Sequence, residues 1–218
     1  MKRSSLDGLE TLVKRLDAGL SSKDKVRERA IALSRELVRT CADAIRELRE
    51  KGRAGKAILR ADALAATLEK ATAGYPELHA SGLVENALQE LAETHILEAL
   101  VTGKRIPAPE TFHCTPAAFL LGMGDAIGEL RRVSQDALRK GNIAEAADAL
   151  HLMEGLYAPL NMFDYPDAIV PLKHKQDVAR GLIEKTRGEV AVAVRGRDLE
   201  NKIAALEKVL ARHAPARR

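Results

Sequence analysis

Two acidic residues stand among glycines in the stretch LLGMGDAIGELRR. Asp125 and Glu129 are four residues apart, so they share one face of a helix. Each glycine in a helix interior costs roughly 1 kcal/mol relative to alanine. Gly122, Gly124 and Gly128 therefore indicate that a neighbouring helix or a substrate backbone comes close to this segment. Carboxylates in such a place are candidates for binding a metal ion.

A second acidic pair, Glu90 and Glu93, interrupts the apolar surface of a helix expected over residues 81–102. A buried carboxylate is costly unless it is paired, protonated or bound to a metal. The two pairs supply only oxygen ligands, which suit a hard cation such as Mg²⁺ or Mn²⁺. A di-iron site would require Glu-x-x-His on two helices, and the chain holds that motif only at Glu110 and His113, in a loop.

The same acids also fit ordinary structural roles. Glu129 and Arg132 have the spacing of an i,i+3 ion pair, which is worth only a few tenths of a kcal/mol. Asp125 and Asp136 lie on the same polar strip, and such a strip is typical of a solvated helix face. From periodicity alone, a metal site and a solvated face both stay open for this segment.

Basic residues form two groups that are spaced to contact phosphates. They are Arg35, Arg39 and Arg46 in the first long helix, and Lys173, Lys175 and Arg180 at the start of the last one. Guanidinium and ammonium groups on one helix face can follow a phosphate backbone. Aromatic residues make up only 3% of the chain, so base stacking would contribute little and recognition would depend mainly on phosphates. The alternative for both groups is a solvated face with mixed ion pairs.

Composition limits the class of protein. Hydrophobic residues make up 46% and charged residues 30%, with no tryptophan, which is typical of a helical globular protein. No apolar run approaches the roughly 20 residues of a membrane span, and the first residues lack the apolar stretch of a signal peptide. We therefore expect a cytoplasmic protein with no membrane contact. The formal charge of +4 permits nucleic-acid binding, and Cys41 and Cys114 are expected to be core thiols.

Apolar residues recur at helical spacing almost throughout, with interruptions at Gly and Pro. The pattern predicts an all-α, single-domain bundle of about six or seven helices over residues 1–218, with residues 1–20 and 212–218 as flexible ends. The main helices are expected at residues 23–51, 56–73, 81–102, 115–140, 142–160 and 172–212. Ser21 or Ser22 would cap the first, and Thr115 with Pro116 would start the fourth.

The last predicted helix contains two patterns that need interpretation. Residues 189–194, EVAVAV, alternate with the strand period, but helical patterns flank them, so a helix is favoured. Leu199, Ile203, Leu206 and Leu210 follow one another at coiled-coil spacing. This seam predicts docking either on the protein's own bundle or on another subunit.

Four stretches occur in order over roughly residues 25–197: ALSRELVR, ALQELAE, TPAAFLLGMGDAIGELRR and LKHKQDVARGLIEKTRG. Their order and combination resemble the translin and translin-associated factor X family, in a compact single-chain form like the archaeal members. The resemblance implies a translin-like all-helical subunit that assembles into a hollow homo-oligomer, an octamer in most members, with nucleic acid inside.

In the factor X branch, acids on two helices form a metal-dependent endoribonuclease site, and the matching positions here are Glu90, Glu93, Asp125 and Glu129. The resemblance therefore implies that these residues bind Mg²⁺ or Mn²⁺ and cut single-stranded RNA. One alternative is a non-catalytic RNA-binding or single-stranded DNA-binding protein of the translin type, in which the acids are structural. A second alternative is a helical assembly module without a nucleic-acid role.

Overall fold

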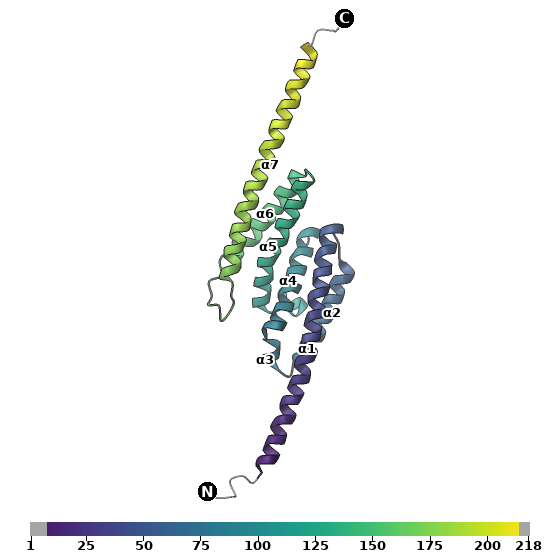
Figure 1. The fold of residues 1–218 in the computed structure, drawn as a ribbon, viewed down its shortest axis with the longest axis vertical. Helices are drawn as coiled ribbons and strands as arrows, with labels where there is room; N and C mark the ends of the chain where they lie inside the picture. The colour runs from purple at the N-terminus through teal and green to yellow at the C-terminus, as the bar shows by residue number, and fades with distance from the viewer. Residues whose placement is uncertain (1–7, 214–218) are drawn as a thin grey trace. The chain divides into compact units, whose positions relative to one another are not determined.

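The computed structural model describes residues 8–213, and every regular element in that range is helical (Figure 1). Within this range, seven α-helices and one 3-10 helix follow one another along the chain. They pack as two compact units that divide between Gly122 and Met123, inside α5 (Pro116–Arg139). The all-α fold is confirmed, whereas the expectation of a single domain stays a prediction.

The first unit contains α1 (Leu9–Lys51), α2 (Gly55–Thr72) and α4 (Gly82–Thr102), with the short α3 (Pro76–His79) and η2 (Pro109–Phe112) between them. Because α4 is apolar on nearly all sides, it is buried along most of its length. The shared core includes Leu37, Leu68, Leu88, Leu91 and Phe112. Cys41 and Cys114 are buried in the same core, as expected.

Several helix boundaries follow from local chemistry that the sequence shows. α1 and α4 end at Gly52 and Gly103, whose φ angles of 67° and 66° are left-handed and favour glycine. α5 begins at Pro116, in the first turn, where a proline needs no N–H partner. The Thr115 hydroxyl accepts a hydrogen bond of 3.1 Å from the backbone N–H of Ala118. The expected helix ends at residues 51 and 102, and the expected helix start at Thr115 and Pro116, are confirmed.

The first helix is longer than its sequence pattern predicted. α1 begins at Leu9 and not near residue 23, so Ser21 and Ser22 lie inside the helix and do not cap it. Serine is a favoured cap but also tolerates a helix interior, and here the apolar residues on both sides keep the helical spacing. Residues 1–7 and 214–218, which belong to the expected flexible ends, lie outside the described residues.

The second unit holds the remainder of α5 together with α6 (Ile143–Leu160) and α7 (Lys173–His213). Arg131 links α5 to α7, because its guanidinium donates to the Thr186 hydroxyl at 2.6 Å and to the Glu189 carboxylate at 2.7 Å. Residues 189–194 are helical as expected. Within this helical segment, Val190 packs into a small core with Ala137 and Ala146.

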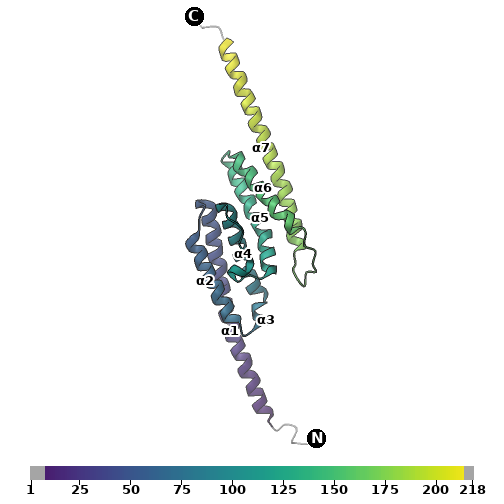
Figure 2. The ribbon, with the colours of Figure 1, turned by 180° about the vertical axis from the view of Figure 1, so that it is seen from behind.

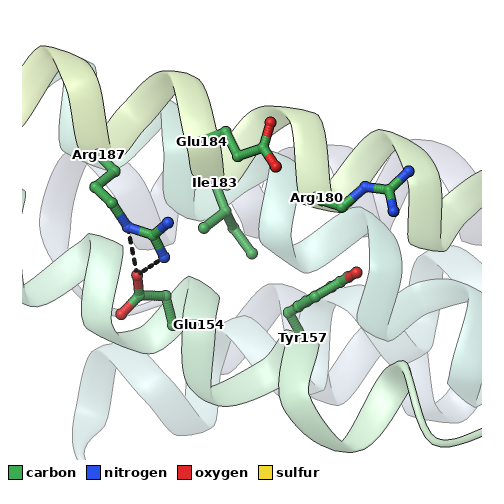
Figure 3. Close-up of a pocket in the computed structure, with 6 residues that line it drawn as sticks. All are labelled: Glu154, Tyr157, Arg180, Ile183, Glu184 and Arg187. Atoms are coloured by element: carbon green, nitrogen blue, oxygen red, sulfur yellow. Dashed lines mark hydrogen bonds and ion pairs between the residues drawn. The ribbon is translucent and has the colours of Figure 1, made fainter.

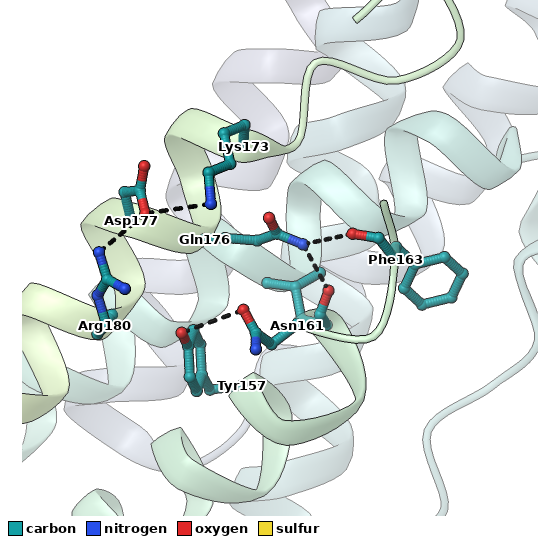
Figure 4. Close-up of polar contacts among 8 residues, drawn as sticks. Tyr157, Asn161, Phe163, Lys173, Gln176, Asp177 and Arg180 are labelled. Atoms are coloured by element: carbon teal, nitrogen blue, oxygen red, sulfur yellow. Dashed lines mark hydrogen bonds and ion pairs between the residues drawn. The ribbon is translucent and has the colours of Figure 1, made fainter. Parts of the chain in front are cut away.

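A buried glutamine fixes the start of α7. The Gln176 side-chain amide donates to the carbonyl oxygens of Leu160 at 3.0 Å and Phe163 at 2.8 Å (Figure 4). Gln176 thereby satisfies backbone groups at the end of α6, where no further helical turn can do so. The loop between the two helices contains Pro166 and Pro171 and is irregular, as predicted.

The outer parts of α1 and α7 are not covered by their own units. Their exposed apolar side chains are Leu9, Leu12, Val13, Leu16 and Leu20 on α1, and Leu199, Ile203, Leu206 and Leu210 on α7. Both views show each helix end extending past the other helices of its unit (Figures 1 and 2). Over the part of the chain that is described, no helix combines the length and the apolar character needed to cross a membrane.

Candidate functional site

The first acidic pair lies on α4, one helical turn apart. Glu93 is buried at 7% exposure, and Glu90 is half-buried. Burial raises the pKa of the nearby Cys41 thiol on α1 to about 12, and the negative charges of Glu90 and Glu93 add to this effect. A helix as apolar as α4 places these carboxylates in poorly hydrated surroundings, where they require compensation.

The second acidic pair lies on α5, and each member contacts a basic side chain. Lys175 Nζ of α7 donates to the Asp125 carboxylate. Arg132 donates to the Glu129 carboxylate at 2.6 Å. This is the i,i+3 ion pair that the sequence analysis gave as the alternative to a metal site. Glu129 is nevertheless buried at 7% exposure, so it does not lie on a solvated face. The structure thus contains the ion pair, with its acidic member buried and Arg132 exposed.

The two acidic pairs belong to different units, because the chain divides between Gly122 and Met123. Over residues 8–213 no group of three or more His, Cys, Asp and Glu side chains is arranged to hold a metal ion. The donor chemistry does fit a hard cation, since all four groups are carboxylates and neither cysteine lies exposed near them. Their joint role as metal ligands and catalytic residues stays a prediction.

The three glycines of α5 have different surroundings. A Cβ atom at Gly122 would lie 2.9 Å from the backbone nitrogen of Glu93, so α5 packs there against the backbone of α4. A Cβ atom at Gly124 would lie 3.1 Å from Cβ of Lys175, and one at Gly128 would meet nothing within 4 Å. The close approach of a neighbouring helix is confirmed at Gly122, whereas Gly128 has open space beside it.

A contact between His95 and Asp62 was not foreseen from the sequence. His95 Nε2 lies 2.7 Å from Asp62 Oδ1 on α2, and the imidazole ring centre is 4.3 Å from that of Phe112. His95 is buried among core side chains of α4. It therefore joins α4 to α2.

The predicted phosphate-binding residues of α1 fall into two kinds. Arg46 donates to Asp43 at 2.7 Å. Within residues 8–213, Arg35 and Arg39 form no ion pair or side-chain hydrogen bond, and both guanidinium groups are exposed. They line a pocket between α1 and α4. These two arginines are therefore available to an anionic ligand without prior loss of a protein partner.

All three predicted cations of α7 have acidic neighbours. Asp177 lies between Lys173, at 3.7 Å, and Arg180, at 3.0 Å (Figure 4), and Lys175 contacts Asp125. Neutralised cations of this kind must give up a carboxylate before they bind a phosphate. The sequence showed the positive charges but not these pairings.

A pocket of about 370 Å³ lies between α6 and α7, beside this cationic group (Figure 3). Arg180 and Tyr157 form one end of it. At the other end, Arg187 donates to Glu154 at 3.2 Å through Nε. Glu184 also lines the pocket, so its positive and negative side chains balance and it shows no preference for an anion.

These observations define an all-α protein with buried carboxylates on α4 and α5 and unpaired arginines on α1. The sequence profile of the Translin family matches residues 56–192. The uncharacterized protein MJ0175 of Methanocaldococcus jannaschii is 32% identical over 187 residues, which cover 84% of this chain and 83% of the relative. The chain belongs to the translin family, and the resemblance drawn from its four stretches is confirmed.

Solved structures support the fold. The crystal structure of AfC3PO matches with a TM-score of 0.75 and 33% sequence identity, and the match covers 87% of this chain and 98% of the AfC3PO chain. The AfC3PO complex with duplex RNA is 32% identical, with a TM-score of 0.73 over 87% and 97%. The structure of apo-NeC3PO, at 24% identity and a TM-score of 0.70 over 88% and 98%, shows the fold alone.

Proposed function

We propose that the protein is a metal-dependent endoribonuclease that cuts single-stranded RNA inside a homo-oligomer. The observation that carries this proposal is the burial of two carboxylates, Glu93 on α4 and Glu129 on α5, both 7% exposed. Carboxylates at this depth cost several kcal/mol unless a proton, a cation or a metal compensates them. Acids buried at this depth do not belong to solvated helix faces, and a bound metal ion would compensate their charge together with Arg132.

Four residues would hold the cation: Glu90, Glu93, Asp125 and Glu129. Glu90 and Glu93 lie one helical turn apart on α4, and Asp125 and Glu129 lie one turn apart on α5. When bound, Mg²⁺ or Mn²⁺ supplies a water of lowered pKa and compensates negative charge on the phosphate. The carboxylates would hold the ion in place, and Asp125 and Glu129 would first leave their contacts with Lys175 and Arg132.

RNA binding is supported by two independent points. The similar protein AfC3PO has been solved with duplex RNA, and Arg35 and Arg39 of this chain have no acidic partner among the described residues. Guanidinium groups one turn apart can each donate two hydrogen bonds to phosphate oxygens. Phosphate contacts of this kind position a strand without reading its sequence, so we expect weak sequence preference.

We infer that the exposed stripes at the ends of α1 and α7 contact other copies of the chain. Leu199, Ile203, Leu206 and Leu210 have the spacing of a coiled-coil seam, and all four are exposed within the single chain. An apolar stripe of this length is a liability in a monomer. Light scattering should show an assembly of several 23.7 kDa subunits, eight in an octamer, and a monomer at micromolar concentration would contradict the enclosed site.

The second candidate is a non-catalytic protein that binds RNA or single-stranded DNA. It is favoured by the contacts of Lys175 with Asp125 and of Arg132 with Glu129, because these cations compensate the acids without a metal. Single-turnover assays on labelled RNA separate the candidates. We expect cleavage with Mg²⁺ or Mn²⁺, and none after chelation, with binding retained. Binding without cleavage in both metals would establish the second candidate.

A further inference from the structure

A pocket of about 400 Å³ opens between α1 and α4 in the first unit. Its lining consists of Ser34, Arg35, Val38 and Arg39 from α1, with Leu83 and Asn86 from α4. The α1 residues fall on adjoining rows of one face because they are spaced by four, and the α4 residues are one turn apart. The volume lies within the range of about 300–1,000 Å³ that small-molecule sites occupy.

Two of the side chains that line this pocket are cations without an acidic partner. Arg35 and Arg39 have no ion pair within residues 8–213, whereas other arginines of α1, such as Arg27 and Arg46, contact acidic neighbours. Two guanidinium groups one helical turn apart match the oxygen atoms of a phosphate. The pocket therefore offers a positive end to a ligand.

A buried hydroxyl without a partner lies in the same wall. Ser34 is 1% exposed, and its Oγ atom has no hydrogen-bond partner in the structure. Buried polar atoms are nearly always hydrogen-bonded, so an exception calls for an explanation such as a ligand. A hydroxyl can donate to or accept from a group that enters the pocket.

The remaining wall suits a flat, partly apolar group. Val38 packs against the core, and Leu83 is 39% exposed at the rim, where it leaves an apolar surface open. The Asn86 side-chain amide is both a donor and an acceptor, as the recognition of a nucleobase edge requires. One pocket thus combines cations, an amide, a buried hydroxyl and an apolar surface.

The geometry points to a nucleotide-binding pocket between α1 and α4 that holds one unpaired nucleotide of an RNA strand. Its phosphate lies at Arg35 and Arg39, and its base lies against Val38 and Leu83. This inference rests on the proposed RNA binding. A base can enter the pocket only when it is not paired, so the pocket should bind a single strand in preference to a duplex. It is independent of the carboxylates on α4 and α5.

The test is a calorimetric titration of the full-length protein with adenosine 5′-monophosphate, adenosine and inorganic phosphate. We expect the monophosphate to bind more tightly than either fragment, and Arg39→Ala and Asn86→Ala to weaken it at least tenfold. Ser34→Ala should weaken it with no loss of thermal stability, because the Oγ atom has no partner to lose. Arg27→Ala, a matched change on α1 outside the pocket, should leave the affinity unaltered.

The same preparations are assayed with single-stranded RNA and with duplex RNA. If RNA binds but the monophosphate does not, or if the pocket variants bind it like the wild type, the pocket inference is overturned and the proposed function stands. If no preparation binds RNA, the proposed function fails instead. Variants that change the native mass rather than the nucleotide affinity would show that a second copy covers this pocket, which also overturns the inference.

Discussion

Gly122 and Glu93 meet backbone to backbone: a Cβ atom at Gly122 would lie 2.9 Å from the backbone nitrogen of Glu93. Any residue other than glycine would push α5 away from α4 beside one of the predicted ligands. The loss of helix propensity at this position is therefore offset by a packing contact that needs the missing side chain.

Two matched glycine substitutions test this contact. Gly122→Ala should lower the free energy of unfolding by about 1–3 kcal/mol, because neither backbone can yield to the added methyl group. Gly128→Ala should be neutral or raise it by up to about 1 kcal/mol, since its Cβ atom meets nothing within 4 Å and alanine favours the helix. Urea unfolding measures both, and equal effects would contradict the backbone contact.

Salt dependence tests the role of the α1 arginines in RNA binding. If about four phosphates are neutralised, the slope of log K against log salt is roughly −3 for a single strand. Arg39→Ala should flatten it by about 0.7. Arg46→Ala should change it less, because Arg46 must first leave Asp43. Electrophoretic mobility shift over a salt series measures the slope, and an unchanged slope in both variants would place the binding surface elsewhere.

The four acids are tested by isosteric amides. Asp125→Asn, Glu129→Gln, Glu90→Gln and Glu93→Gln each keep the size of the side chain but remove a charged ligand. Each should lower single-turnover cleavage by about 10²-fold or more if the group binds the metal or orients its water. Glu98→Gln, on the same helix as the first pair, is the control. Full activity in the Asp125 and Glu129 variants would leave the non-catalytic candidate.

Lys175 makes a separate prediction, because its ammonium group contacts Asp125 and would compete with a metal ion. Lys175→Met keeps an unbranched chain beside Gly124 and removes the charge. The Mn²⁺ concentration for half-maximal cleavage should fall about two- to fivefold, the factor that corresponds to an ion pair of roughly 0.5–1 kcal/mol. A higher Mn²⁺ requirement would instead assign Lys175 to substrate binding.

The two thiols should be inert in the folded protein. Burial raises the pKa of both Cys41 and Cys114 to about 12, so almost no thiolate is present at pH 8. Because the folded state holds these protons more tightly, the stability they contribute is complete below pH 9.0 and is lost as the pH rises towards about 12. A chromogenic disulfide reagent should label neither until urea is added, and rapid labelling at pH 8 would show that a thiol is exposed.

The sequence predicts what depends on neighbours along the chain, and misses what depends on packing. Thr115 with Pro116 marks the start of α5, and Gly52 marks the end of α1, because caps and left-handed glycines are local features. The predicted start of α1 near Ser21 was wrong, because serine is a favoured cap residue but is also tolerated inside a helix.

The polar partners of the candidate site could not be predicted, because they come from residues far apart in the sequence. Lys175 reaches Asp125 across 50 residues of sequence, and Asp62 meets His95 across 33. Neither spacing repeats a motif, and each contact exists only because two helices pack at one particular rotation. Glu90 and Glu93 were identified from the apolar surface that they interrupt, and Asp125 and Glu129 from the glycines beside them, because both features belong to a single helix.

The uncovered ends of α1 and α7 also bear on how the subunit folds. A helical segment without tertiary contacts is marginal in water, because nucleation is costly and each added residue gains little. The first turns of α1 and the last turns of α7 should therefore fray in an isolated chain, and in the proposed homo-oligomer they would become ordered as copies associate. If the proposed assembly covers these ends, proteases should cut them faster in a separated subunit than in the assembly.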